Sequence, residues 1–361
     1  MDRAAQIKNR ALELGFSQVG IAPASQLSAE RERLEDWVER GYHGEMRWMA
    51  RDSEQRTDPE RIFPAAKSVV VVALNYYTEH QHAVSTTGDA VTEPRALATG
   101  PLGTQASRLL NLRRAALTKK AGGTPVYPGP VATARGSVTG KVSRYAWGDD
   151  YHEVVGDKLR ELLSWIKEQW PGAEGKVCVD IQPTMDKAWA VRAGLGWMGK
   201  HTNLITREYG SWVFIGELFL NLDLECDQDQ IADQCGSCSL CIDACPTDAI
   251  VEPYVVNSNR CISHATIESR APEIGEDVAA HLEGWLYGCD ICQDVCPWNH
   301  TTPTAVEPRF EPREGNVNAS LSEILALTPE TYAARFRHSA MKRAKLAGLQ
   351  RNARTLQNQE R

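Results

Sequence analysis

Hydrophobic positions in the N-terminal part of the chain recur first at helical and then at strand spacing. Residues 4–14 carry the apolar stripe of an amphipathic helix, and SQVGIAP (17–23) has the pattern of a short strand. A second helix is predicted over SAERERLEDWVERGY (28–42), with Ser28 as its N-cap. The apolar run 69–74 predicts a buried strand, because it is far too short to cross a bilayer.

This pattern is interrupted once and then resumes. Residues 81–141 are rich in Thr, Gly, Ala and Pro and lack apolar periodicity, which predicts a long and largely disordered insertion. Beyond it the chain predicts a turn into a helix (142–166), a strand (176–181), a helix ended by glycines (184–196) and two strands between 201 and 220. Helices and strands that alternate in this way predict an α/β sandwich domain.

Composition and charge are those of an ordinary globular protein. The chain has 361 residues, enough for two domains, and is 42% hydrophobic and 24% charged with a formal net charge of −7. Its first residues are charged and helical in pattern, unlike a signal peptide, so we expect a cytoplasmic protein that does not bind a membrane. In that reducing compartment its 10 cysteines are expected to be metal ligands rather than disulfides.

Charge is concentrated in two segments. Residues 208–259 contain ten acidic residues and no Lys or Arg. A solvated surface and a functional role explain this acidic stretch about equally well. The C-terminal segment has seven basic residues and no acid between Tyr332 and Arg354. These are Arg335, Arg337, Lys342, Arg343, Lys345, Arg351 and Arg354. A basic tail on an acidic protein suggests a polyanionic partner, either nucleic acid or a membrane surface.

The cysteines form two sets. QCGSCSLCIDACPTDAI (234–250) has the spacing C-x2-C-x2-C-x3-C-P, in which three thiolates hold one 4Fe-4S cube and the fourth ligates a second. Partners for that second cube follow at Cys261 and in a C-x2-C-x3-C-P run from Cys289. By this exchange one cluster is held by Cys235, Cys238, Cys241 and Cys296, and the other by Cys245, Cys261, Cys289 and Cys292. The alternative is a pair of zinc sites, which do not usually use this exchange. Cys178 and Cys226 are left over, and Cys178 is predicted to be a buried core thiol.

Long stretches outside the cysteine runs follow the sequence pattern of one protein family in order. VDIQPTMDKAWAVRAGLGWMGKHTNLI (179–205) is similar to a signature written near VDTxPxxERAxAxxAGLGWxGKNT. Residues 56–77, 143–162, 210–218 and the tail SAMKRAKLAGLQRNA (339–353) also match. The chain thus resembles epoxyqueuosine reductase over nearly its whole length except 81–141.

The resemblance implies the last step of queuosine synthesis, in which the epoxide of epoxyqueuosine at the tRNA wobble position is reduced to an alkene with release of water. It implies base-off cobalamin and two 4Fe-4S clusters as cofactors. The implied architecture is an α/β cobalamin-binding domain (1–218), a ferredoxin-type two-cluster domain (219–310) and a basic, HEAT-like helical tail (311–361) that grips the anticodon arm. We also expect a monomer that takes electrons from a flavodoxin or ferredoxin.

Asp180 is the residue favoured for catalysis. It ends the predicted strand and enters a loop, where reacting groups cluster in α/β sheets. The family's VDT aspartate is the proton donor, so we expect burial against the corrin to raise the pKa of Asp180 toward neutrality and let it protonate the epoxide oxygen. The alternative is an aspartate that only satisfies loop amides.

Further site residues are implied by the resemblance. Arg56 matches an arginine that contacts cobalamin. Besides Asp180, the segments lining the corrin contain Ser143, Asp150, Leu204, Ile215, Ser263 and Asp290. Packing or capping is the alternative for each of them. In DYHEVVG (150–156) the glycine lies one position too far along for the D-x-H-x-x-G cobalamin motif. His152 is therefore predicted to cap a helix or to pack against one. His201 stands where the family usually has Asn, which puts that polar contact in doubt.

Three other functions fit part of the sequence. A reductive dehalogenase shares the corrinoid and the clusters, but it typically has an export signal and needs no basic tail. A ferredoxin-type electron carrier explains the clusters but not residues 142–218. A corrinoid-handling protein that does not act on tRNA leaves the basic tail without a use.

Overall fold

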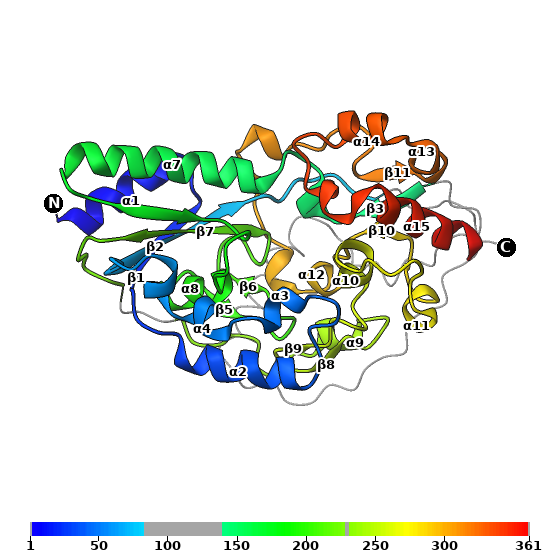
Figure 1. The fold of residues 1–361 in the computed structure, drawn as a ribbon, viewed down its shortest axis with the longest axis horizontal. Coiled ribbons are helices and arrows are strands. Elements are labelled where there is room, and N and C mark those ends of the chain that lie inside the picture. The colour runs from blue at the N-terminus through cyan, green and yellow to red at the C-terminus, as the bar shows by residue number, and fades with distance from the viewer. Residues whose placement is uncertain (1, 83–138, 228–230, 360–361) are drawn as a thin grey trace, which may run out of the picture.

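The computed structural model describes residues 2–82, 139–227 and 231–359 (Figure 1). Most of the predicted insertion, 81–141, lies outside these ranges. Its last residues belong to strand β3 (Thr139–Val142), so the predicted C-terminal boundary of the insertion at 141 is wrong. The strand was missed because its partners lie more than 100 residues further along the chain, in β10 (Trp285–Tyr287) and β11 (Asn318–Ser320).

A four-stranded sheet organises the N-terminal half. Its strands, in spatial order, are β1 (Gln18–Pro23), β2 (Ser68–Asn75), β7 (Val213–Leu220) and β4 (Gly175–Cys178), and every neighbouring pair is antiparallel. One face packs against α1 (Arg3–Glu13) and α7 (Tyr151–Gln169), and the other against α8 (Asp186–Arg192) (Figure 1). All eight residues of β2 are buried between these layers. The predicted α/β class is therefore confirmed, with an antiparallel sheet.

The N-terminal helices agree with the sequence prediction except at one cap. Helix α2 (Ser28–Glu39) begins after Leu27, and no side chain caps its first turn, so the prediction of Ser28 as N-cap is wrong. Leu27 is fully buried and its N–H donates to the Thr57 carbonyl, so core packing fixes the start of the helix. Short helices α3 (Arg47–Ala50), α4 (Ser53–Thr57) and α5 (Pro59–Ile62) lead from α2 to β2.

The cysteine-rich region is dominated by loops, as predicted. Its elements, with the hairpin that precedes it, are β5 (Trp197–Met198), β6 (Leu204–Ile205), α9 (Leu240–Asp243), β8 (Ile250–Glu252), β9 (Val255–Val256), α10 (Ile262–Ile267), α11 (Glu276–Ala279), β10 and α12 (Ile291–Asp294). Single turns of 3-10 helix lie at Arg144–Ala146, Pro297–Asn299 and Pro308–Phe310.

The C-terminal segment is helical, as predicted, and is not separate from the rest. It contains α13 (Leu321–Ala326), α14 (Pro329–Arg335), a 3-10 turn at Ala340–Ala344 and α15 (Lys345–Asn358). One hydrophobic cluster unites Trp147, Leu286 and Met341, which belong to the three predicted domain ranges. Within the described residues, no helix combines the length and apolar character that a membrane span requires.

Candidate active site and cluster-binding region

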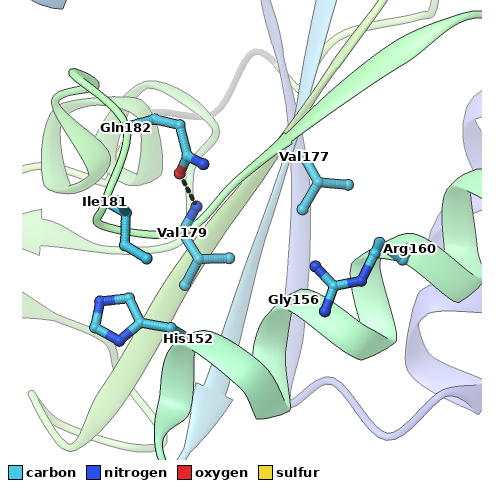
Figure 2. A pocket seen from close by; sticks show the side chains of 7 residues that line it. All are labelled: His152, Gly156, Arg160, Val177, Val179, Ile181 and Gln182. Atoms are coloured by element: carbon cyan, nitrogen blue, oxygen red, sulfur yellow. Dashed lines mark hydrogen bonds between the residues drawn. The ribbon is translucent and has the colours of Figure 1, made fainter. Parts of the chain in front are cut away.

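Asp180 lies at a strained turn two residues beyond β4. Its φ of 53° is in the left-handed region, which is unfavourable for a residue with a Cβ atom. The Val179 N–H donates to the Gln182 side chain at 2.9 Å, and Ile181 projects outward with 75% of its surface exposed (Figure 2). Because the sheet is antiparallel, the rule for the carboxyl ends of parallel strands does not explain this position. The loop places Asp180 beside the first turn of α7.

A hydrogen-bonded group forms where the loop meets α7. The Tyr151 hydroxyl donates to Asp180 Oδ2 at 2.5 Å, and His152 Nε2 lies 3.3 Å from the same oxygen. His152 Nδ1 lies 2.6 Å from Asp150 Oδ1, and Asp150 also caps α7 by accepting the His152 N–H. The prediction that His152 caps or pads a helix is therefore wrong, because its ring bridges two carboxylates.

The contacts within this group shift the pKa values of Asp180 and His152 in opposite directions. Burial favours a higher pKa for Asp180, but hydrogen bonds from His152 and Tyr151 and the charge of His152 outweigh it and hold the pKa below its ordinary value. Burial favours a lower pKa for His152, but Asp150 and Asp180 outweigh it and raise the pKa to about 9. The protein neighbours of Asp180 thus lower its pKa, and at neutral pH the proton of this group resides on His152.

Protonated His152 is expected to stabilise the fold in a pH-dependent way. Its pKa of about 9 lies above its ordinary value of 6.5, so its contribution is complete below pH 6.5 and is lost as the pH rises through 9. We expect His152→Gln to flatten the fall in melting temperature across this interval, with His281→Gln, an exposed histidine, as control. A His152→Gln profile parallel to that of the wild type would contradict the pairing with Asp150 and Asp180.

The other predicted cobalamin-contacting residues lie in several different parts of the fold. Arg56, on α4, donates to the Trp48 carbonyl at 3.0 Å and lies close enough to Asp180 for the carboxylate to affect its pKa. Leu204 and Ile215 belong to one apolar cluster beneath α8. Ser143 and Asp290 are buried and bond to each other at 2.5 Å, while Ser263 lies half-buried on α10.

The two histidines singled out in the sequence both have defined roles here. His201 is 3% exposed, and its Nδ1 accepts the Asn203 N–H at 3.2 Å, so it makes a local contact within its own loop. Burial lowers the pKa of His201 to about 4, which keeps the ring neutral at physiological pH. Both ring nitrogens of His152 face carboxylates, so this histidine is not available to a cobalt ion. A corrinoid in this site would therefore have no imidazole ligand from this segment.

Cysteines of both predicted sets lie near one another in the fold. Burial and the charges of Cys235, Cys241 and Cys238 raise the pKa of Cys296 to about 12. Burial and the charges of Cys261 and Cys245, with Cys241 of the other set, likewise raise that of Cys292. Helices α9 and α12, which carry one cysteine of each set, are in contact. Among the described residues, no three His, Cys, Asp or Glu side chains converge as a single metal ion requires.

Comparison with known proteins identifies the family. Residues 234–299 match the family model "4Fe-4S double cluster binding domain", and residues 126–181 match "Epoxyqueuosine reductase QueG, DUF1730". Epoxyqueuosine reductase of Synechocystis sp. is 40% identical to this chain over 93% of its length and 98% of that protein. The chain belongs to the epoxyqueuosine reductase family. It is therefore an oxidoreductase, and the predicted family and enzyme class are confirmed.

Solved structures of this family share the fold of the chain. A crystal structure of epoxyqueuosine reductase with an epoxyqueuosine-modified tRNA-Tyr stem loop has a TM-score of 0.76 and 30% identity, covering 97% of this chain and 80% of that one. Epoxyqueuosine reductase from Bacillus subtilis, with its catalytic loop swung out of the active site, has a TM-score of 0.76 and 28% identity at the same coverage. The mixed α/β fold with a double-cluster domain is thus that of epoxyqueuosine reductases.

Proposed function

We propose that this member of the family reduces the epoxide of epoxyqueuosine at the wobble position of tRNA to the alkene of queuosine. The observation that carries the proposal is the group formed by Asp180, Tyr151 and His152, which holds the proton of His152 3.3 Å from the accessible carboxylate of Asp180. Asp180 has 59% of its side chain exposed. The relative solved with an epoxyqueuosine-modified stem loop supports the substrate.

The reaction consumes two electrons and two protons. Cobalamin in its reduced state supplies the electron pair when it is bound. We propose that Arg56, Asp150, Leu204 and Ile215 contact it, with Ser143, Ser263 and Asp290 in the segments around it. Ser143 and Asp290 act through their mutual hydrogen bond, which fixes the turn before α7.

The contacts of Asp180 provide a route for the proton that reaches the epoxide oxygen. The imidazolium of His152 donates its Nε2 proton to the Asp180 carboxylate, and the carboxylic acid then protonates the oxygen of the opening epoxide. Tyr151 holds the carboxylate in place through its hydroxyl. The strained φ of Asp180 and the exposure of Ile181 favour a loop that moves, as in the Bacillus subtilis relative, so loop closure would bring the acid to the substrate.

Electrons would reach this site through the two clusters held by the exchanged cysteine sets. Cys238 is exposed, which makes its cluster the natural point of contact for a flavodoxin or ferredoxin donor.

Four further predictions stay predictions. They are the domain ranges 1–218, 219–310 and 311–361, the HEAT-like nature of the tail, the monomeric state and the cytoplasmic location.

Two arginines of the basic tail are engaged in contacts within the protein. Arg351 is 5% exposed and bonds to backbone carbonyls, among them that of Ala265 at 2.6 Å, so it stabilises the fold and does not neutralise a phosphate. Arg343 forms a bidentate ion pair with Glu268. Exposed cations remain at Arg337, Lys342, Lys345 and Arg354. We propose that these contact the anticodon arm.

Replacement of Lys342, Lys345 and Arg354 by Ala is expected to weaken tRNA binding and to reduce its salt dependence. Each lost phosphate contact removes about 0.9 from the slope of log affinity against log salt, so the slope should fall by up to about three. The matched control replaces Arg33, Lys67 and Lys167, three exposed cations outside the tail. An unchanged slope in the tail variant would place the tRNA elsewhere.

A complementation experiment tests the proposed function. Cells that lack epoxyqueuosine reductase accumulate epoxyqueuosine in their tRNA, and expression of this chain should replace it with queuosine. Nucleosides from purified tRNA are measured by mass spectrometry. Persistent epoxyqueuosine, with the protein present and loaded with iron, would refute the proposal and favour another corrinoid iron–sulfur activity.

A further inference from the structure

Glu217 is a buried carboxylate at a position where a charge would be costly. It lies in the middle of β7, is fully buried, and neither of its carboxylate oxygens has a hydrogen-bond donor among the described residues. A carboxylate without a partner in such a place is strongly destabilised, whereas the neutral acid is tolerated. Glu217 therefore carries a proton in the folded protein.

The group that can accept this proton in a hydrogen bond is Asp186, at the start of α8. Their side chains are in hydrogen-bonding contact, and Asp186 also accepts the Thr184 hydroxyl. Two ionised carboxylates cannot hydrogen-bond, so the contact itself requires a proton on one of them. Asp186 is half-buried, whereas Glu217 is closed off from solvent, so Asp186 is the accessible end of the pair.

The titratable and charged groups around the pair come from the elements packed on it. These are Asp180 in the loop, Lys187 on α8, Arg56 on α4, and Lys176 and Cys178 on β4. Burial and the charge of Asp180 raise the pKa of Asp186 to about 6. Burial and Asp186 raise that of Glu217 well above its ordinary value. Because Glu217 is fully buried without a donor and Asp186 is the accessible end, the pair holds one proton and one negative charge near Asp180.

We propose that Asp186 and Glu217 share one proton and supply it as the second proton of the reduction. This inference rests on the proposed function. In that reaction the epoxide gains two electrons and two protons and yields an alkene and water. One proton passes through Asp180 to the epoxide oxygen. The other leaves the Asp186–Glu217 pair as the carbon–oxygen bond breaks, so that the departing oxygen leaves as water.

The direction of this transfer follows from relative basicity. A departing hydroxide is far more basic than a carboxylate, so it removes the shared proton and leaves both carboxylates ionised. Lys187, whose ammonium group is held 2.9 Å from the Thr202 carbonyl, lies beside the extra negative charge. Solvent returns the proton through Asp186 and restores the pair.

Infrared spectroscopy tests the shared proton without turnover. Glu217→Gln has nearly the same shape and can still bond to Asp186, but it has no acidic proton. The difference spectrum between wild type and variant, recorded on cluster-loaded protein at pH 7.5, should contain a protonated-carboxyl C=O band that shifts in D₂O. Asp186→Asn, a second variant, should shift this band because it breaks the sharing. Absence of the band from the wild type would overturn the proposal.

Single-turnover kinetics test the role of the proton. We expect Glu217→Gln to bind substrate tRNA normally and to convert it about 10-fold or more slowly, with the loss growing as the pH rises. Glu208→Gln, at an exposed position before β7, should match the wild type. A Glu217→Gln rate within about threefold of wild type at every pH would remove the pair from the reaction. A wild-type enzyme that converts no epoxyqueuosine would instead refute the proposed function, and the infrared result would stand separately.

Discussion

Asp180→Asn is expected to retain both clusters and bound cobalamin and to lose most of its queuosine formation. The amide is nearly isosteric, so packing and the hydrogen bond from Tyr151 should persist. The variant cannot receive a proton from His152 and pass it to the epoxide. A positioned general acid contributes about 10²–10⁴ in rate, or roughly 3–5 kcal/mol of barrier.

The measurement is single-turnover conversion of epoxyqueuosine tRNA by prereduced enzyme, with cobalamin occupancy read from the visible spectrum. Asp149→Asn is the control, because Asp149 pairs with Arg313 next to the site and touches neither His152 nor Asp180. An Asp180→Asn enzyme with full cobalamin and a rate within about threefold of wild type would remove Asp180 from the mechanism. Asp150, the other carboxylate on His152, would then be the next candidate.

Cys296→Ser is expected to remove the cluster of the first cysteine run, although Cys296 lies in the second run. Its neighbours are Cys235, Cys238 and Cys241, so the exchange predicts about four irons per chain in place of about eight. Turnover should fall to background, since one link in the electron path is missing. Cys226→Ser, outside both sets, is the control and should keep all of the iron.

Alkylation identifies which thiols are released in the Cys296→Ser variant. Under anaerobic conditions the thiols of Cys235, Cys238 and Cys241 should become reactive. The remaining cluster should protect Cys245, Cys261, Cys289 and Cys292. Peptide mass mapping reads this directly. Reactivity at Cys289 and Cys292 instead would show that each run holds its own cluster, and zinc in place of iron would refute the cluster assignment.

Local sequence patterns predicted the elements whose burial is regular. The continuous apolar run of β2 and the helical apolar stripe of α1 are visible in the local sequence, so both elements were predicted from it. Strand β3 was missed because its partners are distant in sequence. The start of α2 was misplaced because burial of Leu27, and not capping by Ser28, determines it.

The double-cluster motif and the loop position of Asp180 were predicted from the sequence, whereas the charges of the site were not. Cluster ligands follow a fixed spacing, but the pKa of Asp180 depends on His152, which approaches it only in the folded chain. The buried location of Arg351 has the same kind of origin, since its partners lie about 80 residues earlier. For Glu217 a signal existed: it is a single acid within the apolar strand VFIGELFL, and such a residue is buried only for a reason.

Conversion of epoxyqueuosine tRNA by purified, reduced protein is the most direct test of the proposed epoxide reduction. The protein is loaded with iron, sulfide and cobalamin, incubated with the tRNA under anaerobic conditions, and the nucleosides are quantified by mass. We expect queuosine to appear in the amount in which epoxyqueuosine disappears, and no conversion when cobalamin or reductant is omitted. Protein with full cluster and cobalamin content that leaves epoxyqueuosine unchanged would contradict the proposed function.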